Sequence, residues 1–391
     1  MGITLKTLNL PTAQRKLSPY ALRASRAFPA AKPPFNRVAF AAAHVVADPL
    51  AEHDPWLEPA IDWERTIAFR QHLWSLGFGV AEAMDTAQRG MGLDWSNSLE
   101  LIRRSVEAAR ATPDAVVFSG AGTDHLAPSA ALDVDEVIRA YEQQIAAIEK
   151  IGGRIILMAS RALAAAAKSP DDYANVYGRI LGQVREKVII HWLGDMFDPA
   201  LAGYWGHKDA GKAMDVAVEI IGANAARIDG VKISLLDKDK EIAMRRRLPK
   251  NVRMYTGDDF NYAELIDGDA QGHSDALLGI FDAIAPAASA ALGALAKGDK
   301  KAFHAILAPT VPLSRHIFKA PTRFYKTGIV FMAYLNGHQD HFTMVGGQQS
   351  TRSALHLAEL FRLADAAGLL RDPDLAAARM RATMALHGIA A

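Results

Sequence analysis

Eight short apolar runs, separated by longer amphipathic segments, limit the folds that this chain can adopt. The runs are residues 37–43, 78–84, 115–119, 154–158, 187–192, 230–234, 252–256 and 275–280. An apolar run without polar alternation is typical of a strand that is buried on both faces of a parallel sheet. Strand–helix alternation repeated about eight times predicts parallel βα units, and eight such units close a barrel.

The segments between the runs carry apolar residues at three- and four-residue spacing, which predicts amphipathic helices. These segments are residues 63–76, 96–111, 134–151, 170–185 and 212–226. A doubly wound open sheet is the competing architecture, but no Gly-x-Gly-x-x-Gly follows the first run. We therefore predict an α/β fold, a (β/α)8 TIM barrel over residues 37–295.

The two ends of the chain depart from this pattern. Residues 1–36 are expected to form an N-terminal arm or an extra strand pair. Three segments beyond the last run have the spacing of helices, residues 299–307, 313–335 and 351–367. We expect residues 296–391 to form a C-terminal helical extension that packs on the barrel. A length of 391 residues fits a barrel of about 250 residues with such additions.

Composition excludes several classes of partner. The chain has 44 basic and 43 acidic residues, so its net charge of +1 favours neither nucleic acid nor an anionic membrane surface. No apolar stretch reaches the length of about 18 residues that a membrane span needs. The absence of cysteine excludes disulfides, thiolate metal sites and a cysteine nucleophile. Because the N-terminal residues also lack the apolar core of a signal peptide, we expect a cytoplasmic protein.

Active sites of such barrels lie at the carboxyl ends of the strands, which selects the polar side chains to consider. Eight of these are candidates for substrate binding: His44, Asp85, Thr86, Ser160, Ser234, Asp258, Asp259 and, just before the eighth run, His273. Two more residues are candidates for catalysis. His191 lies near the end of the fifth run, and Lys232 lies within the sixth.

Lys232 is unusual because it lies within an apolar run, between Val231 and Ile233. Burying an ammonium group is costly, and burial lowers the pKa of a lysine by favouring the neutral amine. A neutral amine in an apolar pocket is what imine formation with a ketone or aldehyde requires. The alternative is a lysine that extends to solvent or pairs with Asp258 or Asp259. The residues alone leave both interpretations open.

Several short motifs occur in the order found in a known enzyme family. They are Asp85-Thr86-Ala87, Ser119-Gly120-Ala121-Gly122-Thr123, Gly230-Val231-Lys232, Gly257-Asp258-Asp259 and Asp275–Pro286. Over about residues 36–300 the chain resembles the dihydrodipicolinate synthase/N-acetylneuraminate lyase family of class I aldolases. The resemblance implies a lyase whose imine forms on Lys232 with a small-molecule carbonyl substrate. It also implies a homo-oligomer, a dimer or tetramer, and neither a metal nor a cofactor is expected.

Two positions depart from the family pattern. His191 stands where the family has a proton-relaying tyrosine, and histidine performs acid–base work near neutral pH. The family's pair of carboxylate-binding hydroxyls is reduced to Thr86 beside Asp85, and an acid there is expected to repel a substrate carboxylate. This favours a keto-sugar-like substrate, while a keto acid stays a candidate.

Two alternatives remain at this point. His44, Asp85, His125, His191, Asp258 and His273 all lie near predicted strand ends. Histidines with carboxylates would serve a metal-dependent hydrolase or epimerase acting on a carbohydrate. The replaced tyrosine also leaves open a carbohydrate-binding barrel without catalysis.

Overall fold

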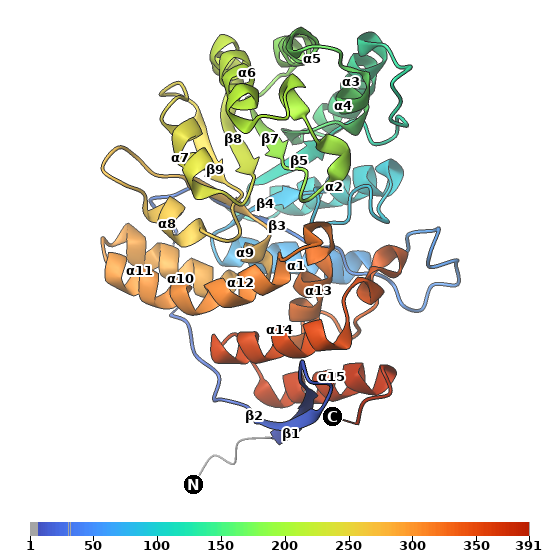
Figure 1. Ribbon diagram of the computed structural model, residues 1–391, viewed down its shortest axis with the longest axis vertical. Coiled ribbons are helices and arrows are strands. Elements are labelled where there is room, and N and C mark those ends of the chain that lie inside the picture. The colour runs from blue at the N-terminus through green and yellow to red at the C-terminus, as the bar shows by residue number, and fades with distance from the viewer. Residues whose placement is uncertain (1–6, 30, 32, 391) are drawn as a thin grey trace.

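The computed structural model describes residues 7–29, 31 and 33–390, and eight parallel strands form a closed barrel at its centre (Figure 1). In chain order they are β3(Ala39–Ala42), β4(Gly79–Glu82), β5(Val117–Ala121), β6(Arg154–Met158), β7(Val188–Leu193), β8(Ile228–Ser234), β9(Arg253–Thr256) and β10(Asp275–Leu278). β10 pairs with β3 and closes the sheet. Each predicted run overlaps one strand, so the (β/α)8 TIM-barrel fold is confirmed.

Helices surround the barrel, as the spacing of apolar residues predicts. They are α1(Trp63–Ser75), α2(Trp95–Arg110), α3(Val134–Lys150), α4(Arg161–Ala166), α5(Pro170–Gln183), α6(Ala210–Ala223), α7(Lys238–Arg245), α8(Tyr262–Asp267), α9(Ile280–Ala283) and α10(Ala285–Ala296). Five of them begin after an aspartate whose side chain accepts a hydrogen bond from the backbone three residues on, at Asp62, Asp94, Asp133, Asp209 and Asp237. Such caps satisfy free N–H groups and fix where each loop ends and its helix begins.

Side chains fill the inside of the barrel, so the barrel is not a channel. Phe40 lies at the centre, with its ring centroid 5.3 Å from that of Phe118 and 5.9 Å from that of Tyr255. Ile156, Ile189 and Leu277 belong to the same buried cluster. Because this layer closes the interior, a ligand can enter only at an end of the strands.

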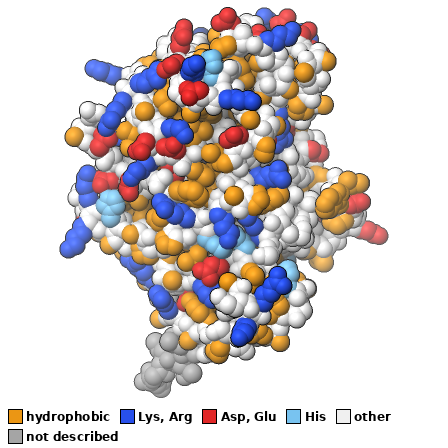
Figure 2. All heavy atoms as spheres, in the orientation of Figure 1, with side chains coloured by type: hydrophobic (Ala, Val, Ile, Leu, Met, Phe, Trp, Pro, Cys, Tyr) orange, Lys and Arg blue, Asp and Glu red, His pale blue; other side chains and the backbone are white. Residues whose placement is uncertain are grey.

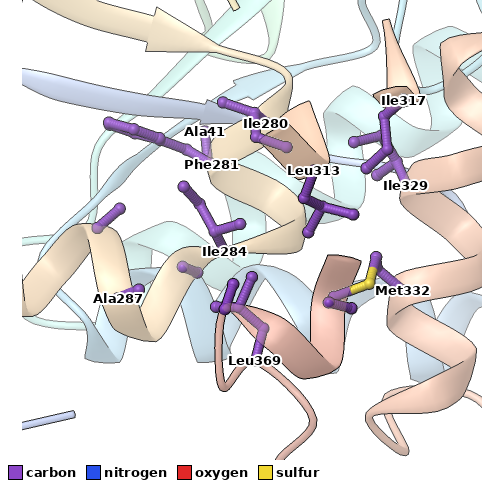
Figure 3. Close-up of a cluster of buried hydrophobic side chains, with 14 of the residues drawn as sticks. Ala41, Ile280, Phe281, Ile284, Ala287, Leu313, Ile317, Ile329, Met332 and Leu369 are labelled. Atoms are coloured by element: carbon purple, nitrogen blue, oxygen red, sulfur yellow. The ribbon is translucent and has the colours of Figure 1, made fainter. Parts of the chain in front are cut away.

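The C-terminal residues form five further helices beside the barrel (Figure 1). They are α11(Lys300–Leu307), α12(Val311–Ile317), α13(Tyr325–Leu335), α14(Ala354–Ala366) and α15(Pro373–Leu386). Figure 3 shows Ile280 and Ile284 of the barrel side among Leu313, Ile329 and Met332 of these helices. The C-terminal extension therefore shares one apolar core with the barrel.

The prediction of one continuous helix over residues 313–335 is wrong. The structure has two helices there, α12 and α13, with Pro321 between them. Proline has no backbone N–H and disfavours a helical conformation in the residue before it, so a helix rarely continues through it. As a result α13 is a separate helix that begins at Tyr325, and all of its residues are buried.

The N-terminal residues form an antiparallel pair, β1(Thr7–Pro11) and β2(Leu17–Ala21), which packs on the C-terminal extension. The Tyr20 hydroxyl donates to Asp365 Oδ2 at 2.7 Å, and Arg362 donates to the carbonyl oxygen of Pro11 at 2.9 Å. The first and last segments of the described chain are thus in contact.

The surface carries both signs of charge. Acidic and basic side chains are interspersed on the face that Figure 2 shows, in keeping with the balanced composition. Among the described residues, no helix combines the length and apolar character that crossing a membrane would need.

Arg70 forms the most deeply buried ion pair of α1. Its guanidinium donates to both oxygens of Glu82, at 2.9 and 2.8 Å, and neither side chain is exposed to solvent. Arg70 also donates to the carbonyl oxygens of His44 and Thr66. This pair fixes α1 against the end of β4.

We predict that Arg70→Met lowers the free energy of unfolding by about 3–5 kcal/mol, because it leaves the Glu82 carboxylate buried without its cation. The matched control is Arg65→Met, which breaks an ion pair with Asp340 whose side chains are 45% and 64% exposed. This exposed pair contributes less than about 1 kcal/mol. Urea unfolding of both variants measures the difference, and equal losses would contradict the prediction.

Candidate active site

Six of the ten residues selected from the sequence line one pocket at the carboxyl ends of the strands. They are Asp85, Thr86, His191, Lys232, Ser234 and Asp259. Lys232 and His191 are neighbours across β7 and β8, while Asp85 and Asp259 follow β4 and β9. Closure of the barrel therefore assembles one inner pocket from four different strands.

Lys232 is held between its own strand and the loop after β9. A Cβ at Gly257 would lie 2.8 Å from Lys232 Cε and 2.3 Å from Ser234 Oγ, so only glycine leaves room for the lysine side chain. Lys232 is 7% exposed. It neither extends into solvent nor forms an ion pair or hydrogen bond with any residue that the structure describes.

The electrostatic surroundings of Lys232 favour its neutral form. Burial lowers the pKa of the amine, and the carboxylates of Asp259 and Asp85 oppose that shift without reversing it. An unpaired amine with a lowered pKa supplies more of the nucleophilic form at neutral pH.

The two aspartates after β9 have different positions. Asp258 Oδ1 accepts hydrogen bonds from the backbone of Phe260 and Asn261, so this side chain fixes the turn into α8. Asp259 lines the pocket, and its Oδ1 accepts from the backbone N–H of Ile280 at 2.9 Å. Burial raises the pKa of Asp259, and the charge of Lys232 opposes this shift. Asp259 is therefore protonated more readily than an ordinary carboxyl.

His191 is 2% exposed, and its Nε2 lies 3.3 Å from Ser234 Oγ. Burial, and next the positive charge of Lys232, lowers the pKa of His191 well below its usual value. The lowered pKa favours the neutral form of the His191 imidazole at neutral pH. A neutral imidazole can still transfer a proton through its hydrogen bonds, accepting at one nitrogen and donating from the other.

Tyr325, the first residue of α13, lines the same pocket. Its hydroxyl shares a hydrogen bond with Thr86 Oγ1 at 2.8 Å. Burial raises the pKa of this phenol, which keeps it protonated. Sequence analysis missed Tyr325 because it placed the residue inside one long packing helix. The signal was Pro321, which predicts a helix boundary just before it.

Lys326, next to Tyr325, is buried and its Nζ lies 3.0 Å from Asp85 Oδ1. It also donates to the carbonyl oxygen of Arg323 at 3.0 Å. The premise that Asp85 gives the pocket an uncompensated negative charge is therefore corrected. A substrate carboxylate is not excluded on that ground.

An outer pocket adjoins the inner one and shares Asp85, His191 and Leu193 with it. Ser160 lines this outer pocket, where its hydroxyl bonds Thr123 at 2.5 Å and caps α4. The outer pocket has a volume of about 90 Å³ and the inner one about 10 Å³. The inner volume holds roughly one water-sized group beside the Lys232 amine.

Three candidate residues line neither pocket: Asp258, described above, His44 and His273. His44 is fully buried, and its Nδ1 lies 2.8 Å from Asp282 Oδ2 on the outside of the barrel. His273 precedes β10 and lies at the amino ends of the strands. Burial, and next the charge of Arg37, lowers its pKa, and the charge of Asp275 opposes this shift. The structure therefore does not bring these three together with the other candidates, and their contact with a substrate stays a prediction. Within the described residues, no three histidine or carboxylate side chains form a group that could hold a metal ion.

The sequence matches, over residues 8–389, a family described as "Protein of unknown function (DUF993)". The chain belongs to this family. A comparison with curated proteins found no match.

Similar solved structures come from the dihydrodipicolinate synthase family. The enzyme from Aquifex aeolicus is 13% identical, with a TM-score of 0.63 over 86% of this chain and 100% of its own. YagE, a prophage protein of that family from E. coli K12 in complex with pyruvate, is 13% identical, with a TM-score of 0.65 over 85% and 99%. The enzyme from Cyanidioschyzon merolae with lysine bound is 16% identical, with a TM-score of 0.62 over 85% and 99%. These likenesses confirm the fold that the sequence resemblance implies.

The pKa of Lys232 can be tested without a substrate. We predict that Asp259→Asn moves the half-point of Lys232 reactivity down by about one pH unit, because it removes a charge that stabilises the ammonium form. The rate of reductive methylation at Lys232, followed by peptide mass spectrometry as a function of pH, measures this. Asp171→Asn, on the exposed surface of α5, serves as the control and should leave the curve unchanged. An unchanged or upward shift in Asp259→Asn would contradict the role assigned to this carboxylate.

Proposed function

We propose that this protein is a Schiff-base-forming lyase or aldolase that makes or breaks a carbon–carbon bond in a keto acid or keto-sugar-like substrate. The observation that carries the proposal is the Lys232 amine, which is buried at the carboxyl end of β8 without a partner among the described residues. The fold shared with dihydrodipicolinate synthases supports it.

In the proposed reaction the neutral Lys232 amine attacks the ketone carbon. The new C–N bond forms as the carbonyl π electrons move to oxygen. The oxygen takes up a proton and the amine nitrogen loses one, which gives a neutral carbinolamine. A second proton converts the hydroxyl into water, which leaves as the protonated imine forms. Asp259 is the proposed donor of that proton, because its raised pKa lets it carry one near neutral pH.

The protonated imine then serves as the electron acceptor for bond cleavage. The electron pair of the breaking C–C bond moves into the imine and gives an enamine, while the departing carbon becomes an aldehyde by losing its hydroxyl proton. The enamine carbon is protonated, and water hydrolyses the imine to release the ketone and the free amine. Condensation runs through the same steps in reverse.

Two hydrogen-bonded pairs flank the amine and are the proposed proton relays. His191 with Ser234 lies on β7 and β8, and Tyr325 with Thr86 joins α13 to the loop after β4. His191, Tyr325, Thr86 and Ser234 all line the inner pocket. Tyr325 would supply the phenol that the fifth strand lacks.

The size of the two pockets supports a substrate with a small carbonyl end. That end would enter the inner pocket, and the rest would lie beside Ser160 and Arg161 in the outer one. Arg161 is 37% exposed and paired with Asp198 of the same pocket, and Asp85 is paired with Lys326, so the outer pocket offers hydrogen-bond donors and acceptors.

We also propose that the protein is a cytoplasmic homo-oligomer, a dimer or tetramer. The absence of cysteine supports the location. Leu50, Trp56 and Leu57 are 92%, 74% and 73% exposed on the segment after β3, and such apolar side chains favour a protein contact.

Borohydride trapping tests the imine directly. We predict that pyruvate or dihydroxyacetone, with sodium borohydride, adds a covalent mass to the peptide that contains Lys232. Lys232→Ala should abolish the adduct, while Lys238→Ala, at an exposed lysine just beyond the same strand, should retain it. If none of the keto acids and keto-sugars tried gives an adduct on Lys232, the proposal fails and a binding barrel without catalysis is favoured.

A proton-exchange measurement separates the role of the two proposed proton relays from imine formation on Lys232. We predict that His191→Phe and Tyr325→Phe each slow the exchange of pyruvate methyl protons with deuterated water by about 10²–10⁴-fold, because exchange requires proton transfer to the enamine. Trapping by borohydride should persist in both, since Lys232 is intact. Tyr173→Phe, at a buried tyrosine outside both pockets, is the control. A near-normal rate in either variant would remove that residue from the mechanism.

A further inference from the structure

A second cavity, of about 400 Å³, lies between the barrel and the C-terminal extension. Its walls come from the arm before the barrel, α1, α9, α13 and the turn after α14, and it shares no lining residue with the Lys232 pockets. It is therefore a separate place where a small molecule can bind.

The inner wall of this cavity has a carboxylate with one oxygen free. Asp282 Oδ2 accepts from the backbone N–H of His44 and pairs with His44 Nδ1, both at 2.8 Å. Asp282 Oδ1 is buried and has no hydrogen-bond partner, and neither has His72 Nε2. Leaving a buried polar atom unpaired costs free energy. A ligand that forms hydrogen bonds with these two atoms would remove that cost.

The mouth of the cavity is positively charged. Arg26 and Arg371 line it, both are exposed, and neither is paired with a carboxylate among the described residues. Burial, and in addition the charge of Arg371, lowers the pKa of both His72 and His338. The imidazoles are therefore neutral, and the guanidinium groups provide the positive charge.

Apolar side chains separate the two polar ends. Met332 and Leu369 are buried and face the cavity, and Phe28 lies beneath the Arg26 guanidinium at 5.2 Å. Figure 3 shows Met332 and Leu369 in the core that joins the barrel to the extension. A ligand that fits here has an apolar body between a hydrogen-bond donor and an anionic group.

We propose that this cavity binds a small carboxylic acid with an apolar body and a hydrogen-bond donor at its far end. The donor would bond Asp282 Oδ1, and the carboxylate would lie between Arg26 and Arg371. The site is distinct from the imine chemistry proposed for Lys232 and does not depend on it.

The test uses 4-hydroxyphenylacetate as the probe, in isothermal titration of the full chain. Phenylacetate lacks the hydroxyl donor and 2-(4-hydroxyphenyl)ethanol lacks the carboxylate, so each should bind about tenfold more weakly or worse. Arg371→Met changes an exposed residue and should weaken binding of the probe by about tenfold, whereas Arg139→Met on α3 should not. Asp282→Asn should erase the preference for the hydroxylated probe.

Two further results would overturn the proposal. One is the lack of saturable binding by any of the three probes at millimolar concentration. The other is binding that Arg371→Met leaves unchanged. The same titration on Lys232→Ala should give the wild-type affinity, because that variant removes the proposed imine chemistry and leaves the cavity intact. Failure at this cavity is thus distinguishable from failure of the proposed lyase function.

Discussion

Closure of eight parallel strands brings all their carboxyl ends to one rim, and the candidate site depends on this constraint. Lys232, His191 and Asp259 come from chain segments far apart in sequence, and no local structure would place them together. The ring layer around Phe40 closes the interior beneath them. The pocket is narrow for this reason, and burial in it is what lowers the pKa of Lys232.

The second constraint is the packing of α13 against the barrel. All residues of this helix are buried; its first side chain lines the inner pocket, and its second pairs with Asp85 of that pocket. Tyr325 brings a phenol to Thr86, and Lys326 balances the charge of Asp85. The extension is thus part of the candidate site, where it places a phenol beside Thr86 and a cation beside Asp85.

The barrel, its strands and most of the inner pocket could be predicted from sequence because they rest on local pattern. Apolar runs mark each strand, and the strand ends mark Lys232 and its neighbours. The positions of His44, His273 and Tyr325 could not be found in this way. His44 is turned outward by its bonds to Asp282, and His273 precedes its strand. Tyr325 reaches the pocket only through tertiary packing of a helix that follows Pro321, about ninety residues after Lys232.

The position of α13 in the chain also determines when the pocket around Lys232 is completed during synthesis. A ribosome that has added Leu278 has made every barrel strand, yet the pocket around Lys232 still lacks Tyr325, and Asp85 lacks Lys326. The hairpin of β1 and β2 must wait longer still, because Tyr20 pairs with Asp365 and Thr7 accepts a hydrogen bond from Arg381 at 2.8 Å. Domains generally fold as units while the chain emerges. Here a hairpin made before the barrel takes its native place only after helices that are made after the barrel, and the Lys232 amine is enclosed only once α13 has been made.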